Sequence, residues 1–307
     1  MSNHAAAAPA TGRPRRPGRV APYLFVGPAV LLLVAFGVVP ILVAAGVSLT
    51  DLNIRGLGDP DRIEFVGLGN YLKLADDPAF WSALKVTAGF VVVGVPAIVV
   101  LSMAVALLLH QSGGRLARVL RSFYFMPAIM AVVAISLVWG YLLNTQFGLA
   151  NHFLESIGLD PIPWLSSPGW AKVSVGLVAV WRATGLNIII FLAALQGIPP
   201  EYLEAAAIDG ANAWQRTVRI VIPLLRFATF FVTITTVINW LQFFDEPYVL
   251  TQGGPAGATT SISLYIFQQG FRQNQFGFAS AGSLALFALI AVVTFIQLRV
   301  RRRQDDD

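Results

Sequence analysis

The sequence predicts an all-α membrane protein with six transmembrane helices and a cytoplasmic helix-turn-helix loop between helices four and five. Only 12% of the 307 residues are charged and 56% are hydrophobic, whereas a soluble domain carries about 25% charged residues. Several apolar runs are long enough to cross about 30 Å of hydrocarbon as helices. A polar stretch from Pro199 to Leu225 interrupts these runs, and we expect it to lie in water.

The six expected spans follow one another along the chain. Each contains roughly 20 residues or more, which is the length that a helical crossing requires. Prolines fall within or at the ends of the first three spans, where a helix bundle tolerates them because neighbouring groups satisfy the freed carbonyls. The spans cover approximately 22–49, 80–110, 121–143, 172–197, 223–244 and 279–298.

Two tails are expected to flank these spans. Residues 1–20 are small, proline-rich and basic, which predicts a disordered cytoplasmic tail. A cleaved signal peptide is the alternative, but the apolar run that follows is longer than the core of about 7–15 residues found in such peptides. We therefore expect a six-helix domain over 21–299, with the polar loop at about 198–223, and a second cytoplasmic tail over 300–307.

The distribution of basic residues predicts the orientation in the membrane. Fourteen of the 21 lysines and arginines fall in the N-terminal tail, the loop after the second span, the segment after the fourth span and the C-terminal tail. Cytoplasmic loops carry an excess of such residues. Both termini and the polar loop are therefore expected in the cytoplasm.

Composition excludes several kinds of chemistry. The chain has no cysteine, which excludes disulfides and thiol catalysis. Its three histidines are scattered, without metal-ligand spacing or a catalytic constellation, so we expect neither a metal site nor enzymatic activity. The net charge of +5 could suggest a nucleic-acid partner, but arginines that flank membrane spans account for it without one.

The sequence of the polar loop predicts two short helices joined by a glycine turn. Pro199 and Pro200 end the fourth span and can begin a helix, because proline suits a first helical turn. The alanines that follow favour a helix of little bulk. Gly210 permits the positive φ of a helix C-terminus, Asn212 can cap the next helix, and Pro223 marks the return to the membrane. An ordinary solvated loop that happens to be helical is the alternative.

The loop sequence EAAAIDGANAWQRTVRIVIPLL, from Glu204 to Leu225, closely resembles the EAA loop of binding-protein-dependent ABC transporter permeases, especially the maltose-type, sugar-transporting branch. Two further segments, FDEPYVLTQGG over 244–254 and GLGNY over 67–71, are similar to other parts of that family. Many sugar permeases carry a phenylalanine near Thr217 and Val218, which this chain lacks. The matching loop positions are Glu204, Ala205, Ala206, Asp209, Gly210, Ala211, Ile220, Pro223 and Leu224.

The resemblance implies a non-enzymatic transport subunit that forms a sugar pathway in the bacterial cytoplasmic (inner) membrane, surrounded by lipid. It implies a second permease, expected to be a different chain, two cytoplasmic ATPase subunits, and an extracytoplasmic sugar-binding protein. The chain has no GxxxxGK[ST] loop, so ATP and Mg²⁺ are expected on the partner ATPase and no cofactor on this chain. The residues implied in ATPase coupling are Glu204, Ala205, Ala206, Asp209, Gly210, Ala211 and Pro223.

Polar side chains inside the fourth and fifth spans are candidates for the substrate pathway, because ionisable and polar residues within a membrane are often functional. Together they supply hydrogen-bonding groups and aromatic faces, which sugars require. The alternative is that they hydrogen-bond between helices, and that Arg182 forms a structural ion pair with Asp245 or Glu246. The candidates are Trp181, Arg182 and Asn187 in span four and Asn239, Trp240, Gln242 and Phe243 in span five, with Thr235 on the same face as Asn239 and Gln242.

Three other functions are compatible with parts of the sequence. A permease for another solute, such as glycerol phosphate or a polyamine, would share the loop, but glycerol phosphate would require more basic groups in the spans than Arg182 alone. An ion-coupled secondary transporter predicts acidic residues inside the spans, which are almost absent, and leaves the polar loop unexplained. A membrane enzyme lacks a catalytic set.

Overall fold

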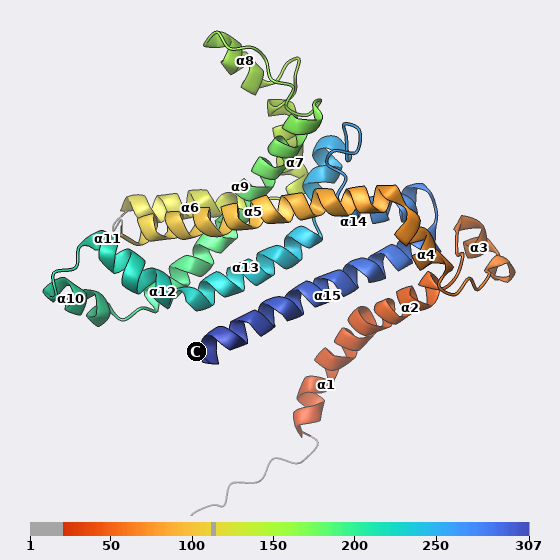
Figure 1. Cartoon of the computed structure of the whole chain (residues 1–307), viewed down its shortest axis with the longest axis horizontal. Coiled ribbons are helices and arrows are strands. Elements are labelled where there is room, and N and C mark those ends of the chain that lie inside the picture. Colours follow the sequence, from red (N-terminus) through yellow and green to blue (C-terminus); the bar gives the residue numbers. More distant parts are fainter. Residues whose placement is uncertain (1–20, 112–114, 307) are drawn as a thin grey trace, which may run out of the picture. The chain divides into compact units, whose positions relative to one another are not determined.

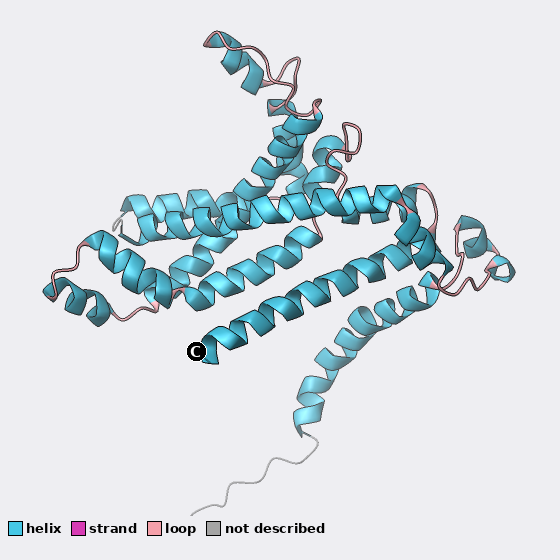
Figure 2. Ribbon diagram, viewed as in Figure 1, coloured by secondary structure: helices cyan, strands magenta, loops and turns pink. Residues whose placement is uncertain are grey.

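The computed structural model describes residues 21–111 and 115–306, and it is built from helices and their connections (Figure 1, Figure 2). Within these residues β-pairing is limited to two isolated bridges, Thr50 with Phe65 and Asn53 with Gln275. The disordered tail predicted for residues 1–20 lies outside the described residues. The chain divides into two compact units, one up to Gly46 and one from Val47 onward.

The first unit is a helical segment that corresponds to the first predicted span. Helix α1 (Ala21–Leu33) continues through the π-helical turn η1 (Val34–Val38) into α2 (Val39–Ser48). The stretch Tyr23–Ser48 is long and apolar enough to cross a membrane, and its large apolar side chains are exposed. An all-round apolar helix of this kind is typical of a membrane span.

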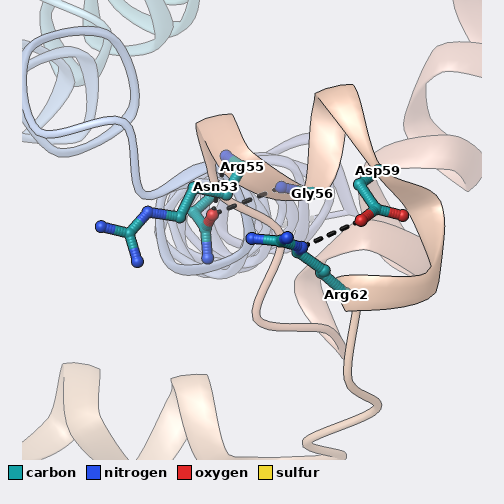
Figure 3. A network of polar contacts seen from close by, with 5 residues as sticks. All are labelled: Asn53, Arg55, Gly56, Asp59 and Arg62. Carbon is teal, nitrogen blue, oxygen red and sulfur yellow. Dashed lines mark hydrogen bonds and ion pairs between the residues drawn. The ribbon is translucent and has the colours of Figure 1, made fainter.

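The second unit begins with an ordered connection between the first two predicted spans. It contains α3 (Ile54–Gly58), η2 (Pro60–Arg62) and α4 (Gly69–Asp76). Figure 3 shows how α3 starts: Asn53 Oδ1 accepts hydrogen bonds from the backbone N–H groups of Arg55 (2.9 Å) and Gly56 (3.4 Å), as a capping residue does. An exposed ion pair of 2.9 Å joins Arg62 to Asp59 beside it.

Three long helices and one shorter one form the body of this unit. Helix α5 (Pro78–Gln111) packs against α9 (Pro168–Gln196) and α13 (Arg226–Leu241), and α13 also packs against α15 (Phe276–Asp306). The buried side chains form a first cluster near the C-terminal ends of α5 and α9, and a second around Trp240. The residues predicted as a C-terminal tail, 300–307, are helical through Asp306.

One of the predicted spans is broken in its middle, and a second bend lies at the start of another. The segment expected as one helix over 121–143 consists of α6 (Arg115–Ile129) and α7 (Val132–Leu142), which meet at 103°, because Ala131 adopts an extended ψ of 122°. A bend of 61° separates Ala213–Leu224 from α13, close to Pro223, where proline removes a helical hydrogen bond. The described residues thus hold four candidate spans, or up to six if each bent pair is one span.

The remaining elements lie in the connections. Helix α8 (Leu149–Ser156) follows α7; α10 (Pro200–Ile208), α11 (Ala213–Arg216), η3 (Thr217–Val221) and α12 (Ile222–Leu224) join α9 to α13; and η4 (Pro247–Thr251), α14 (Ile262–Phe267) and η5 (Gln268–Arg272) lead into α15. Within the second unit, α10 and α11 lie at one end of α5, whereas α4 and α14 lie toward its other end (Figure 1).

Candidate functional site

The polar loop between α9 and α13 folds as the two short helices that its sequence predicts. Helix α10 ends in a glycine turn, with Gly210 at φ +81°. The N–H groups of Gly210 and Ala211 donate to the carbonyls of Ala207 (3.1 Å) and Ala206 (2.9 Å). These two bonds form a Schellman motif, which satisfies the last carbonyls of a helix and requires a left-handed residue.

The second helix of the loop begins with a complete capping box. Asn212 Oδ1 accepts from the Gln215 backbone N–H (2.8 Å), and the Gln215 side chain accepts from the Asn212 backbone N–H (2.9 Å). Both ends of the turn are therefore fixed by local hydrogen bonds, and the two motifs follow one another directly, since Ala211 closes the first and Asn212 begins the second. We call the whole segment from Pro199 to Leu225 the hairpin.

The outer part of the hairpin is exposed and its base is buried. Glu204, Ala205 and Asp209 are exposed, as are Gly210 and Pro223, whereas Ala206 and Ala211 are half-buried. At the base, Val221 and Leu225 belong to the first cluster, together with Leu109 of α5 and Leu195 of α9. The hairpin is therefore anchored in the helix core and presents its turn outward.

Sequence reasoning missed two large apolar side chains on the exposed part. Ile208 is 87% exposed and Trp214 is 74% exposed. Exposed apolar groups of this size commonly mark a contact surface. The signal was present in the sequence, since both residues stand inside an otherwise small and polar segment.

A cavity of about 520 Å³ lies between α9, α13 and the residues that follow α13. It brings together most of the polar residues predicted for a pathway, from two segments that are about 50 residues apart. Asn187 and Asn239 each donate a side-chain hydrogen bond to their own helix, to Ala183 O (2.9 Å) and Thr235 O (2.8 Å). The predicted residues that line the cavity are Arg182, Asn187, Thr235, Asn239, Trp240, Gln242 and Phe243.

Trp181 does not line this cavity. Its ring packs edge-on against Trp139 with centroids 5.6 Å apart, and it borders a separate apolar groove of about 980 Å³ between α5 and α9. Adjacent residues of a helix point in directions about 100° apart, so Trp181 and Arg182 face different surroundings.

The cavity contains a partly buried ion pair. Arg182 Nε donates to Glu246 Oε1 at 2.7 Å, and the Glu246 side chain is only 1% exposed. Of the two acidic partners that the sequence offered, Glu246 forms the pair, while Asp245 is exposed and lines the same cavity. The sequence thus indicated the ion pair, but not that it forms part of the cavity wall.

The described part of the chain offers no cluster of three or more histidine, cysteine, aspartate or glutamate side chains that could hold a metal ion. The residues that line the cavity supply hydrogen-bonding, charged and aromatic groups.

Comparison with known proteins identifies the class. Residues 90–306 match the family of binding-protein-dependent transport system inner membrane components, and the chain belongs to this family. The match includes the hairpin and every residue of the cavity.

The relatives are permease proteins of transport systems. The lactose transport system permease protein LacF of Rhizobium radiobacter is 38% identical over 287 residues, which is 92% of this chain and 94% of that protein. The trehalose/maltose transport system permease protein MalF of Thermococcus litoralis is 34% identical over 285 residues, with the same coverage of 92% and 94%.

A solved structure shares the fold. It is a bacterial alginate ABC transporter in complex with an alginate pentasaccharide-bound periplasmic protein, and one of its chains superposes with a TM-score of 0.78 at 21% identity, over 92% of this chain and 94% of that one. The likeness supports the helical arrangement found here.

Proposed function

We propose that this chain is the substrate-translocating permease subunit of an ATP-driven importer, and that it forms a sugar pathway across the bacterial cytoplasmic membrane. In this proposal the two bent helix pairs each count as one crossing, which gives six spans with both termini and the hairpin in the cytoplasm. The sugar class is supported by the relatives, which are permeases of lactose and trehalose/maltose systems.

The observation that carries the proposal is that the base of the hairpin packs on α9 and α13, the two helices that also line the cavity. Val221 and Leu225 of the hairpin contact the same cluster as Ile188 of α9 and Val232 of α13. Ile188 follows the cavity residue Asn187 directly, and Val232 lies one turn before Thr236. Because packed interiors transmit strain, we infer that movement of the hairpin is passed through α9 and α13 to the walls of the cavity.

The exposed surface of the hairpin suggests which kind of partner it contacts. Its turn is exposed and held by local hydrogen bonds, with Glu204 and Asp209 on the outside. We infer that two cytoplasmic ATPase subunits, which hold ATP and Mg²⁺, dock on the hairpins of two permease chains. The second permease is a different chain, and an extracytoplasmic binding protein delivers the sugar. Glu204 pairs with a basic group of the ATPase, and the docking energy of the ATPase selects between two states of the bundle.

The test uses the chain co-purified with its neighbouring gene products and reconstituted in liposomes. Gly210→Val forces a β-branched residue into a left-handed conformation, which costs about 1–2 kcal/mol or more, and should abolish sugar-stimulated ATP hydrolysis while the complex still assembles. Glu204→Lys should act in the same direction by reversing a charge.

Gly158→Val is the matched control. Gly158 has φ +80°, and a side chain at either glycine meets no atom within 4 Å, so both variants introduce the same backbone strain. Gly158 lies after α8 and outside the hairpin, and its variant should retain coupling. Full coupled transport by Gly210→Val and Glu204→Lys, or failure of the parental complex to recruit any ATPase, refutes the proposal.

A further inference from the structure

The apolar groove between α5 and α9 is separate from the polar cavity and has walls of a different kind. The two share only Trp240 among their lining residues. The groove is open along α5, because a side chain on Gly89 would meet no atom within 4 Å. Most of its wall is aliphatic or aromatic, including Val86, Phe90, Val93, Val173, Leu177 and Val180.

The two helices of the groove run in the same direction. Their N-terminal halves share one buried cluster, which contains Phe90 and Val175, and their C-terminal halves share another, which contains Leu109 and Leu195. The lining of the groove extends along α5 from Ser82 to Val105. At 1.5 Å per residue this is about 35 Å of helix, whereas the hydrocarbon of one membrane leaflet is only about 15 Å thick. The groove is therefore long enough to hold an acyl chain along its length.

One end of the groove is positively charged. Lys85 and Lys172, two of the three lysines in the chain, line it near the beginnings of α5 and α9, and both are exposed. None of the described lining residues is acidic, and the ion pairs found among the described residues involve neither lysine. The charged end of the groove thus complements an anion.

Two tryptophans indicate the depth of these lysines in the membrane. Trp81 and Trp170 lie in the first turns of α5 and α9 and keep much of their rings exposed. Tryptophans are enriched where a membrane meets water, at the level of the lipid headgroups. Lys85 follows Trp81 by one turn, and Lys172 follows Trp170 by two residues. The ammonium groups therefore lie close to headgroup level, while the apolar groove continues into the hydrocarbon.

We propose that this groove binds an anionic phospholipid, whose phosphate contacts Lys85 and Lys172 and whose acyl chain lies between α5 and α9. An apolar helix of another subunit would fit the walls equally well, but it would bury two lysines without a counter-charge, which is costly. In the orientation proposed above, the lipid belongs to the leaflet on the side opposite the hairpin.

The test counts lipids bound to the purified complex. The chain is co-purified with its neighbouring gene products, stripped of lipid in detergent, and titrated with dioleoylphosphatidylglycerol or dioleoylphosphatidylcholine, which differ in headgroup charge but not in acyl chains. Native mass spectrometry reports the bound lipid. The parent should bind the anionic lipid at about tenfold lower concentration or less, because each basic residue near a membrane surface favours anionic lipid roughly fivefold. Lys85→Gln combined with Lys172→Gln should remove this preference.

Two further variants separate the groove from overall charge. Arg55→Gln combined with Lys73→Gln removes the same formal charge at exposed positions outside the groove, and should leave the preference unchanged. Gly89→Leu fills the apolar part of the groove, where its Cβ meets no other atom, and should weaken the binding of both lipids. Size-exclusion profiles show which variants are folded.

Equal affinity of the parent for the two lipids overturns the inference, as does an equal loss of preference in both double variants or unchanged binding by Gly89→Leu. A complex that binds no lipid here, because a second subunit covers the groove, overturns it too. Glycerol phosphate, which has the phosphate but no acyl chain, should not compete, and effective competition would mark a phosphate site instead. Lipid binding in detergent requires neither transport nor a particular orientation, so its failure leaves the proposed function standing.

Discussion

The contact between Gly94 and Trp240 gives a sharp test of how α5 and α13 are packed. A side chain on Gly94 would place its Cβ 1.9 Å from Trp240 Cζ3 and 2.1 Å from Cη2. Carbon atoms in contact normally lie about 3.5–4.0 Å apart, so the indole ring would have to move by roughly 1.5–2 Å. Trp240 is only 5% exposed and is confined by Phe90 and Phe243.

The loss of stability expected for Gly94→Ala is obtained by comparison with a second glycine of the same helix, Gly89. Alanine stabilises a helix interior relative to glycine by up to about 1 kcal/mol, and this gain applies equally to Gly94→Ala and to Gly89→Ala. A side chain at Gly89 meets no atom within 4 Å, so the difference between the two variants is the cost of overpacking. That cost is typically about 1–3 kcal/mol, and the confined ring places it at the upper end.

Thermal unfolding of the purified protein in detergent, followed by tryptophan fluorescence, measures this difference. Gly94→Ala should unfold several degrees below the parent, and Gly89→Ala at or above it. In a Trp240→Leu background, which removes the ring, Gly94→Ala should lose its cost. Equal midpoints for Gly94→Ala and Gly89→Ala, or an undiminished cost in the Trp240→Leu background, would refute the packing described here.

Two further predictions concern the connections. Asn151 Oδ1 accepts from Ile162 N (3.0 Å) and Trp164 Nε1 (2.8 Å), and its amide donates to two carbonyls. Asn151→Ala leaves these groups unpaired and should make the 144–167 loop at least tenfold more sensitive to limited proteolysis. An unchanged cleavage rate contradicts this role. Burial and a hydrogen bond to Asp77 raise the pKa of Tyr265 above its ordinary value near 10. The folded state therefore keeps the phenol proton, and the free energy of unfolding should fall as the pH rises past 10. This fall should be smaller in Tyr265→Phe, and equal pH profiles of the two proteins would contradict the raised pKa.

Local signals allowed the sequence to predict the hairpin in detail. The positive φ of Gly210, the cap at Asn212 and the start of a helix at Pro200 are each determined by residues within a few positions along the chain. The existence of the long spans was equally accessible, because length and hydropathy suffice to recognise them, but the last helix runs to Asp306, beyond its predicted end at 298. Such features depend on backbone conformation and local hydrogen bonds, which short stretches of sequence encode.

Contacts between distant residues could not be predicted in the same way. Arg182 and Glu246 are 64 positions apart, and the sequence left two acidic partners open because only the packing of α9 against the segment after α13 decides between them. The break between α6 and α7 was missed because the apolar run continues across it, and hydropathy does not report the extended ψ of Ala131. The close packing at Gly94 likewise depends on the indole ring of Trp240, which comes from another helix.

The missing phenylalanine near Thr217 and Val218 does not leave the hairpin without an apolar surface. Trp214 is 74% exposed and Val218, one turn further along, is 38% exposed, while Thr217 turns its hydroxyl back to Ala213 O at 3.0 Å. A largely exposed tryptophan offers more apolar area to a partner than a phenylalanine does. If an ATPase docks on the hairpin as proposed above, we expect the apolar part of that contact to centre on Trp214, one turn before Val218.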